Sequence, residues 1–153
     1  MGTFKTFEEI EAWQQARTLA RLIYDASGKG AFGRNFGLRG QIRRPAVSVM
    51  SNIAEGFGRG GAREFVQFLT VARGSASEVC ARLYVALDQG YLSQPEFRRL
   101  QEQSARAGSV VGGLVRYLRT TGLRGSKFRS VTVRNDERCT NPPSQRSLPT
   151  ADS

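Results

Sequence analysis

The longest regular pattern in this chain is an apolar stripe that runs from about residue 62 to Gly90. Its members recur every three or four residues: Phe65, Leu69, Ala72, Ala76, Val79, Leu83 and Leu87. This spacing places them on one side of an α-helix, and a helix with one apolar side has to bury it against other elements. The stripe therefore predicts a long amphipathic helix and restricts the chain to folds that can cover one.

Three further segments show the same helical spacing. The first ends near Gly28 and carries Ile10, Trp13, Arg17, Ala20 and Tyr24. The second carries Ile42, Ala46, Val49, Ile53 and Phe57 and is ended by the glycines at positions 56, 58, 60 and 61. The last reaches Gly122 and carries Phe97, Leu100, Ala107, Val111, Leu114 and Leu118. Each stripe predicts an amphipathic helix.

Local signals mark where two of these helices begin. Thr6 with Glu9, and Ser93 with Glu96, have the spacing of capping boxes, in which a side chain satisfies free amides of the first helical turn. Four helices of similar length joined by short breaks predict an all-α fold, an antiparallel up-down-up-down four-helix bundle over residues 1–123. Residues 124–153 lose the periodicity, are rich in Pro and Ser, and predict a flexible, disordered C-terminal tail.

The charge of the chain favours acidic partners. The formal net charge is +10, and 20 of the 23 basic residues are Arg. The tail contributes 6 basic and 3 acidic residues, which leaves an excess of 7 for residues 1–123. This balance is typical of proteins that bind nucleic acid or an acidic protein face, and also of an Arg-rich but merely solvated surface.

Several classes of function are disfavoured. The chain has no His, the commonest general base and metal ligand, and no Glu-x-x-His pair that could build a di-iron site in a bundle. Gly56 to Gly61 match the spacing G-x-G-x-x-G, but they follow a predicted helix where a dinucleotide site requires a strand. We therefore predict no enzymatic activity, no metal and no cofactor.

The cellular location is predicted to be the cytoplasm. The two cysteines, Cys80 and Cys139, are far apart and form neither a disulfide framework nor a zinc motif. The N-terminus is charged where a signal peptide needs an apolar run, and no segment has the roughly 18 apolar residues of a membrane span.

Polar residues form a second stripe on two of the predicted helices. One helix carries Arg44, Ser48, Asn52 and Glu55, and the next carries Arg73, Ser75, Glu78 and Arg82. Taken alone, both stripes are solvated helix faces. Gly74 lies between two of these residues, and a mid-helix glycine predicts that another backbone packs closely against it. Pro45 predicts a kink one turn after the start of its helix.

The polar stripes belong to motifs that resemble those of a known family. QIRRPAVSVMSNIAEG, followed by EFVQFLTVARGSASEV, is similar to the four-helix bundle proteins encoded within intervening sequences of bacterial 23S rRNA genes. The resemblance covers about residues 4–123. It implies that the polar residues of SNIAEG and ARGS-x-x-E, namely Asn52, Glu55, Arg73, Ser75 and Glu78, form a buried or interfacial polar network. We assign Arg44 and Ser48, on the same polar stripe as Asn52 and Glu55, to this polar network or subunit interface as well.

The resemblance also implies an assembly and partners. Such proteins resemble bundles that form homopentamers, and they are similar to the accessory variability-determinant proteins of diversity-generating retroelements, which bind a reverse transcriptase and its template RNA. We therefore expect a homo-oligomeric scaffold that binds RNA, DNA or a nucleic-acid enzyme. The alternative is a structural or selfish-element protein of rRNA intervening sequences without direct nucleic-acid contact, and the gene's position would separate the two.

Topology predicts where nucleic acid would bind. In an up-down-up-down bundle, the start of the first helix, the junction of the second and third, and the end of the fourth meet at one end. We call this end the predicted end. Its expected nucleic-acid-binding cations are Lys5, Arg59, Arg63, Arg116, Arg119, Arg124, Lys127 and Arg129.

Overall fold

The computed structural model describes residues 4–121, and these form helices with no strand among them. In chain order the elements are a short 3-10 turn η1 (Phe7–Glu9), α1 (Glu11–Ser27), α2 (Gly30–Arg34), α3 (Phe36–Gly58), α4 (Ala62–Asp88) and α5 (Gln94–Thr120). The prediction of an all-helical chain is confirmed for this range. The predicted tail, with Arg124, Lys127, Arg129 and Cys139, lies outside the described residues.

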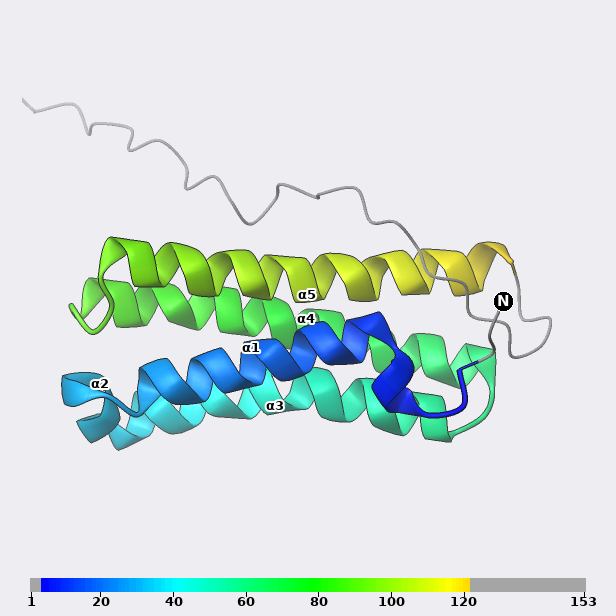
Figure 1. The fold of residues 1–153 in the computed structure, drawn as a ribbon, viewed down its shortest axis with the longest axis horizontal. Helices are drawn as coiled ribbons and strands as arrows, with labels where there is room; N and C mark the ends of the chain where they lie inside the picture. The colour runs from blue at the N-terminus through cyan, green and yellow to red at the C-terminus, as the bar shows by residue number, and fades with distance from the viewer. Residues whose placement is uncertain (1–3, 122–153) are drawn as a thin grey trace, which may run out of the picture.

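The four long helices lie side by side and alternate in direction along the chain (Figure 1). Helix α1 contacts α3 and α5, and α4 contacts the same two helices, so each long helix has two long neighbours. The N-terminal turn, the link between α3 and α4, and the end of α5 lie together at the right of Figure 1. Helix α2 and the link between α4 and α5 lie at the opposite end, which we call the α2 end.

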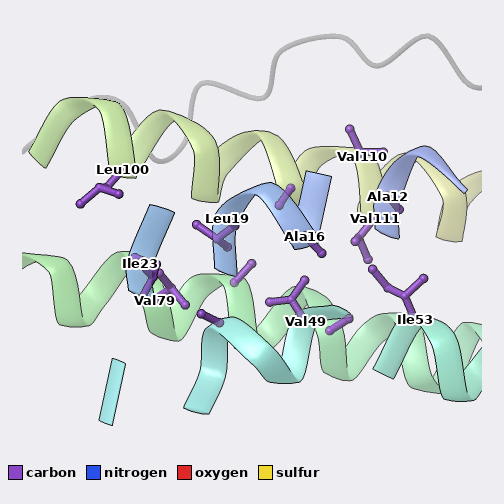
Figure 2. Close-up of a cluster of buried hydrophobic side chains, with 14 of the residues drawn as sticks. Ala12, Ala16, Leu19, Ile23, Val49, Ile53, Val79, Leu100, Val110 and Val111 are labelled. Carbon is purple, nitrogen blue, oxygen red and sulfur yellow. The ribbon is translucent and has the colours of Figure 1, made fainter. Parts of the chain in front are cut away.

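The interior is filled by the stripes predicted for α3, α4 and α5. Phe65, Leu69, Val79 and Leu83 of α4 are buried, as are the four stripe residues of α3 from Ile42 to Ile53. Figure 2 shows Val49 and Ile53 of α3 in the same core as Val79 of α4 and Val111 of α5. Burying this apolar surface is the main stabilising contribution to the packing of these helices.

The stripe predicted for α1 is correct only in part. Ile10 and Ala20 are buried and the partly buried Trp13 packs against the core. Arg17 and Tyr24 are exposed, because the side of α1 that meets the core is turned toward Leu19 and Ile23. The buried residues of the helix are Ala12, Ala16, Leu19, Ala20, Ile23 and Ser27. Alanines carry much of this contact, and their small side chains allow α1 to lie close to its neighbours.

The two capping-box predictions have different outcomes. Ser93 and Glu96 form a complete box at the start of α5, and the hydrogen bonds from Ser93 lower the pKa of the Glu96 carboxyl. Thr6 makes no side-chain cap. It precedes only the short turn η1, while α1 starts later, at Glu11. The Glu9 carboxylate accepts a hydrogen bond from the backbone amide of Lys5 instead.

Two glycines and one proline bear on how the helices pack. A Cβ added to Gly56 would lie 2.5 Å from Cβ of Phe68, so α3 and α4 are in close contact there. Gly74 has open space around it among residues 4–121, and the predicted backbone contact is wrong for this part of the single subunit. Pro45 is buried inside α3, which continues as one helix from Phe36 to Gly58, and the predicted kink stays a prediction.

Candidate nucleic-acid interface

The predicted end brings together the described members of the cation set. Lys5 precedes η1, Arg59 and Arg63 flank the α3–α4 link, and Arg116 and Arg119 lie in the last turns of α5. These elements meet at one end of the molecule (Figure 1). Within residues 4–121, Arg63, Arg116 and Arg119 form no salt bridge. Binding of nucleic acid by these residues stays a prediction.

The described part of this end has no excess of positive charge. Its five cations are matched by five carboxylates, which belong to Glu8, Glu9, Glu11, Glu55 and Glu64. Arg59 is paired with Glu55 at 2.8 Å and its guanidinium lies over the Phe68 ring, 5.3 Å from the ring centre. A net attraction at this end would therefore depend on Arg124, Lys127 and Arg129, outside the described residues.

Three of the seven residues assigned to a polar network form one hydrogen-bonded group. Asn52 of α3 donates its side-chain amide to the Ser48 carbonyl at 2.8 Å and to Ser48 Oγ at 2.9 Å. Ser48 Oγ in turn lies 2.9 Å from Oγ of Ser75 on α4, which is buried. The group satisfies polar atoms in the contact between α3 and α4 and thereby helps to hold these helices in register.

Within residues 4–121, the side chains of the other four residues of the predicted network form no hydrogen bond with this group. Arg44 and Arg73 are exposed, and the Arg73 guanidinium lies against Gly112 of α5. Glu55 pairs with Arg59, as described above, and Glu78 pairs with Arg82 at 3.4 Å. Arg82 also donates to the carbonyl of Gln41 on α3. A role for these residues in a subunit interface stays a prediction.

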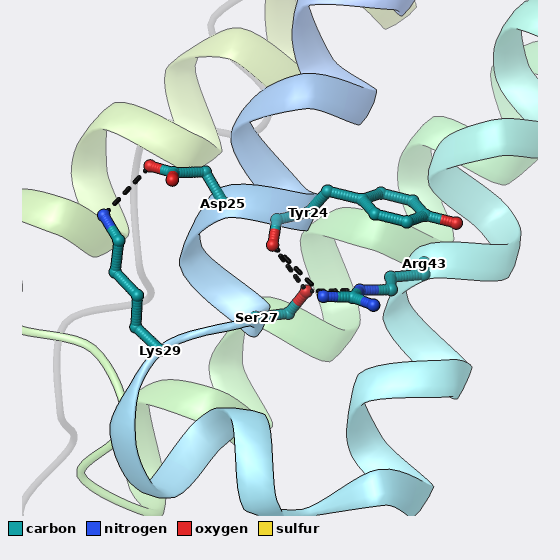
Figure 3. A network of polar contacts seen from close by, with 5 residues as sticks. All are labelled: Tyr24, Asp25, Ser27, Lys29 and Arg43. Carbon is teal, nitrogen blue, oxygen red and sulfur yellow. Dashed lines mark hydrogen bonds and ion pairs between the residues drawn. The ribbon is translucent and has the colours of Figure 1, made fainter.

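A second polar group, which the sequence reasoning missed, joins α1 to α3 near the α2 end. Arg43 of α3 donates from Nε to Ser27 Oγ at 2.8 Å and from Nη2 to the carbonyl of Tyr24 at 3.2 Å (Figure 3). Its guanidinium also lies over the Tyr24 ring, 4.3 Å from the centre. Ser27 is buried at the end of α1, so Arg43 links the end of α1 to α3 through these hydrogen bonds.

Two more arginines stack on aromatic rings of the same helices. Arg39 of α3 donates to the carbonyl of Gly33 at 3.0 Å, and its guanidinium lies 4.5 Å from the centre of the Phe36 ring. Arg17 of α1 lies 5.8 Å from the centre of the Trp13 ring. Phe36, Arg39 and Arg43 are spaced by three and four residues, which indicates that they share one face of the helix. The sequence-based prediction did not use this spacing.

Comparison with known proteins identifies the family. Residues 8–113 match the model of the 23S rRNA-intervening sequence protein family. The chain belongs to this family. The matched range runs from η1 into α5 and includes both polar groups described above.

A solved structure has the same fold as this 23S rRNA-intervening sequence family member. It is a protein of unknown function from the S23 ribosomal protein family of Bacteroides thetaiotaomicron. The two chains are 18% identical and superpose with a TM-score of 0.62 over 68% of this chain and 97% of the other. At this identity the likeness concerns the fold alone. No curated protein matches the sequence of this family member.

Residues 4–121 contain neither a membrane-spanning helix nor a metal-binding cluster. None of the helices in this range is both long enough and apolar enough to cross a membrane. The same range holds no group of three or more Cys, Asp or Glu side chains placed to bind a metal ion.

Proposed function

We propose that this family member is a non-enzymatic, oligomeric scaffold, built on an antiparallel four-helix bundle, whose basic surface binds nucleic acid. The observation that carries the proposal is a positive charge that ion pairs leave largely uncompensated. Residues 4–121 contain 17 Lys and Arg against 10 Asp and Glu. Only Lys29, Arg59 and Arg82 are in salt bridges within that range. The remaining cations are available to replace the counterions of a phosphate backbone.

Binding of this kind is predicted to weaken steeply with salt. Fluorescence anisotropy of the full chain with a labelled single-stranded RNA of about 30 nucleotides would measure it from about 50 mM salt upward. The expected log-log slope is about −0.7 for each phosphate neutralised. Absence of binding at about 50 mM salt would reject the proposal and favour the alternative, a structural or selfish-element protein without nucleic-acid contact.

A nucleic-acid enzyme such as a reverse transcriptase is a further partner for the same scaffold. Its support is the sequence resemblance to the accessory variability-determinant proteins of diversity-generating retroelements. Such an enzyme would be recruited alongside its template, because both would bind to the same positively charged protein.

The proposed oligomer, a homopentamer on the strength of the family resemblance, would use the outer face of α4. Val71 and Val85 are 54% and 46% exposed there. They are separated by 14 residues, about four helical turns, so they share one face with Gly74, around which residues 4–121 leave open space. Val71 lies one turn from this glycine, and an exposed valine beside open space suits close contact with a second copy.

The molecular mass of the protein in solution tests this assembly. Light scattering after gel filtration is expected to return a multiple of the 16.9 kDa chain mass. Val71→Glu is expected to lower that mass because it puts a charge into an apolar contact, whereas Thr18→Glu on the exposed side of α1 is not. A wild-type protein with the mass of one chain at micromolar concentration would contradict the oligomer.

A further inference from the structure

Two aromatic rings at the α2 end are unusually exposed for their size. Tyr24 on α1 is 47% exposed and Phe36 at the start of α3 is 70% exposed. Each carries an arginine over one ring face, Arg43 on Tyr24 and Arg39 on Phe36. An exposed ring with a cation beside it offers both of the features that bind a single-stranded nucleic acid, a surface for base stacking and a charge for the phosphate.

The two arginines keep their positive charge uncompensated. Arg39 and Arg43 donate to the carbonyls of Gly33 and Tyr24 and to the hydroxyl of Ser27, all of which are neutral acceptors. Neither forms a salt bridge with a carboxylate of residues 4–121. These hydrogen bonds orient the guanidinium groups in advance, so less side-chain entropy is lost when a phosphate binds.

The nearby carboxylate does not cancel this charge. Asp25 follows Tyr24 in α1, but its side chain is paired with Lys29 at 3.0 Å. Figure 3 shows this pair on the other side of α1 from the Tyr24 ring and Arg43. The contact of α1 with α3 therefore leaves its cations free of a fixed acidic partner at the point where the aromatic rings lie.

The same arrangement continues along the two helices. Arg17 precedes Tyr24 by seven residues, two helical turns, and so lies on the same side of α1, where it stacks on Trp13. Arg39 precedes Arg43 by four residues and shares its side of α3. Arg43 on Tyr24 joins α1 to α3, and the other two arginine–aromatic pairs lie on the same sides of these helices, Arg17 with Trp13 on α1 and Arg39 with Phe36 on α3. We call this set of residues the α1–α3 seam. It comprises Trp13, Arg17, Tyr24, Phe36, Arg39 and Arg43.

We propose that single-stranded nucleic acid binds along the α1–α3 seam, with bases stacked on Tyr24 and Phe36 and phosphates on Arg39 and Arg43. This inference rests on the proposed function and specifies its site and ligand. It favours the seam over the predicted end, where the described cations and carboxylates are equal in number. Stacking tolerates any base, so the seam selects single strands over duplex without selecting a sequence.

The test separates stacking from charge. The full chain and its Tyr24→Leu, Phe36→Leu double variant are titrated into labelled oligo(U), oligo(dT) and a duplex of equal length. Leucine keeps an apolar side chain but removes the ring, and about tenfold weaker binding is expected for each ring lost. Arg39→Gln is expected to flatten the salt slope by about 0.7, the contribution of one phosphate. The circular dichroism spectrum and the mass of the oligomer have to stay unchanged in every variant.

A matched variant at the other end provides the control. Arg63→Gln with Arg119→Gln removes two exposed cations from the predicted end and is expected to change binding by less than the ring variant. If wild type binds and the ring variant binds equally well, the seam is not the site, although the proposed function survives. If the ring variant loses oligomer mass and not affinity, the seam is a contact between copies. If wild type binds nothing, the proposed function itself fails.

Comparing the affinities for oligo(U), oligo(dT) and the duplex shows which kind of nucleic acid binds to the seam. Weaker binding of the ring variant to both oligo(U) and oligo(dT) supports a seam that contacts the bases and phosphates and not the sugar 2′-hydroxyl. Loss confined to oligo(U) supports RNA as the ligand, because the 2′-hydroxyl is what distinguishes the strands. Equal affinity of wild type for duplex and single strand contradicts base stacking and overturns the inference.

Discussion

Replacing Leu83 with Ala is expected to lower the free energy of unfolding by about 2 to 5 kcal/mol. Leu83 is 0% exposed and lies on the core stripe of α4, which packs against both α3 and α5. The substitution removes apolar contacts and leaves a cavity that rigid neighbouring helices fill only in part. Urea unfolding followed by circular dichroism measures the change through the transition midpoint.

The control for this prediction is Glu102→Ala, an exposed position on α5. Its effect is expected to stay within about 0.5 kcal/mol, because a surface substitution away from caps and packed groups changes little. Equal destabilisation by the two substitutions would show that α4 does not turn this stripe toward the core.

Gly56→Ala is expected to destabilise the protein by about 1 to 3 kcal/mol, although alanine is the better helix former. The added Cβ would lie 2.5 Å from Cβ of Phe68 and 3.0 Å from a ring carbon of Phe65. Cβ of Phe68 is attached directly to the α4 backbone, so the contact is relieved only if α3 and α4 move apart. This loss exceeds the gain of about 1 kcal/mol in helix propensity.

Gly108→Ala is the matched substitution in α5. Its added Cβ would come no closer than 3.7 Å to Cβ of Ala76, an ordinary contact distance. It is expected to raise the melting temperature, since only the propensity gain of up to about 1 kcal/mol remains. A stabilising effect of Gly56→Ala similar to that of Gly108→Ala would contradict the close packing of α3 on α4.

Much of the helical architecture was predictable because periodicity is a local property of sequence. The stripes from Ile42 to Ile53 and from Phe65 to Leu83 are buried as expected, and the Ser93 cap begins α5. In α1 the same reasoning placed Arg17 and Tyr24 on the buried side because they share the three- and four-residue spacing of Ile10 and Ala20, but both are exposed. The buried side is instead rich in alanine, and only the distance between packed helices decides that small residues fit there.

The sites were less predictable because they depend on which helices become neighbours. Asn52 and Ser75 were assigned to one polar network from family motifs and Ser48 from its place on the polar stripe, and the structure joins these three. Arg43 passed unnoticed because its partners, Tyr24 and Ser27, lie on another helix and become neighbours only when α1 packs on α3. A stripe of charge in a sequence does not reveal whether its partners are carboxylates or carbonyls.

The central claim, that nucleic acid binds this helical body along the α1–α3 seam, is tested most directly by photo-crosslinking. Oligo(U) bound to the full chain is irradiated, and the attached peptides are identified by mass spectrometry. We predict attachment at Tyr24 and Phe36, which is lost in the Tyr24→Leu, Phe36→Leu variant. Attachment confined to peptides that contain Arg63 or Arg119, or no attachment under conditions where the RNA is bound, would contradict the account.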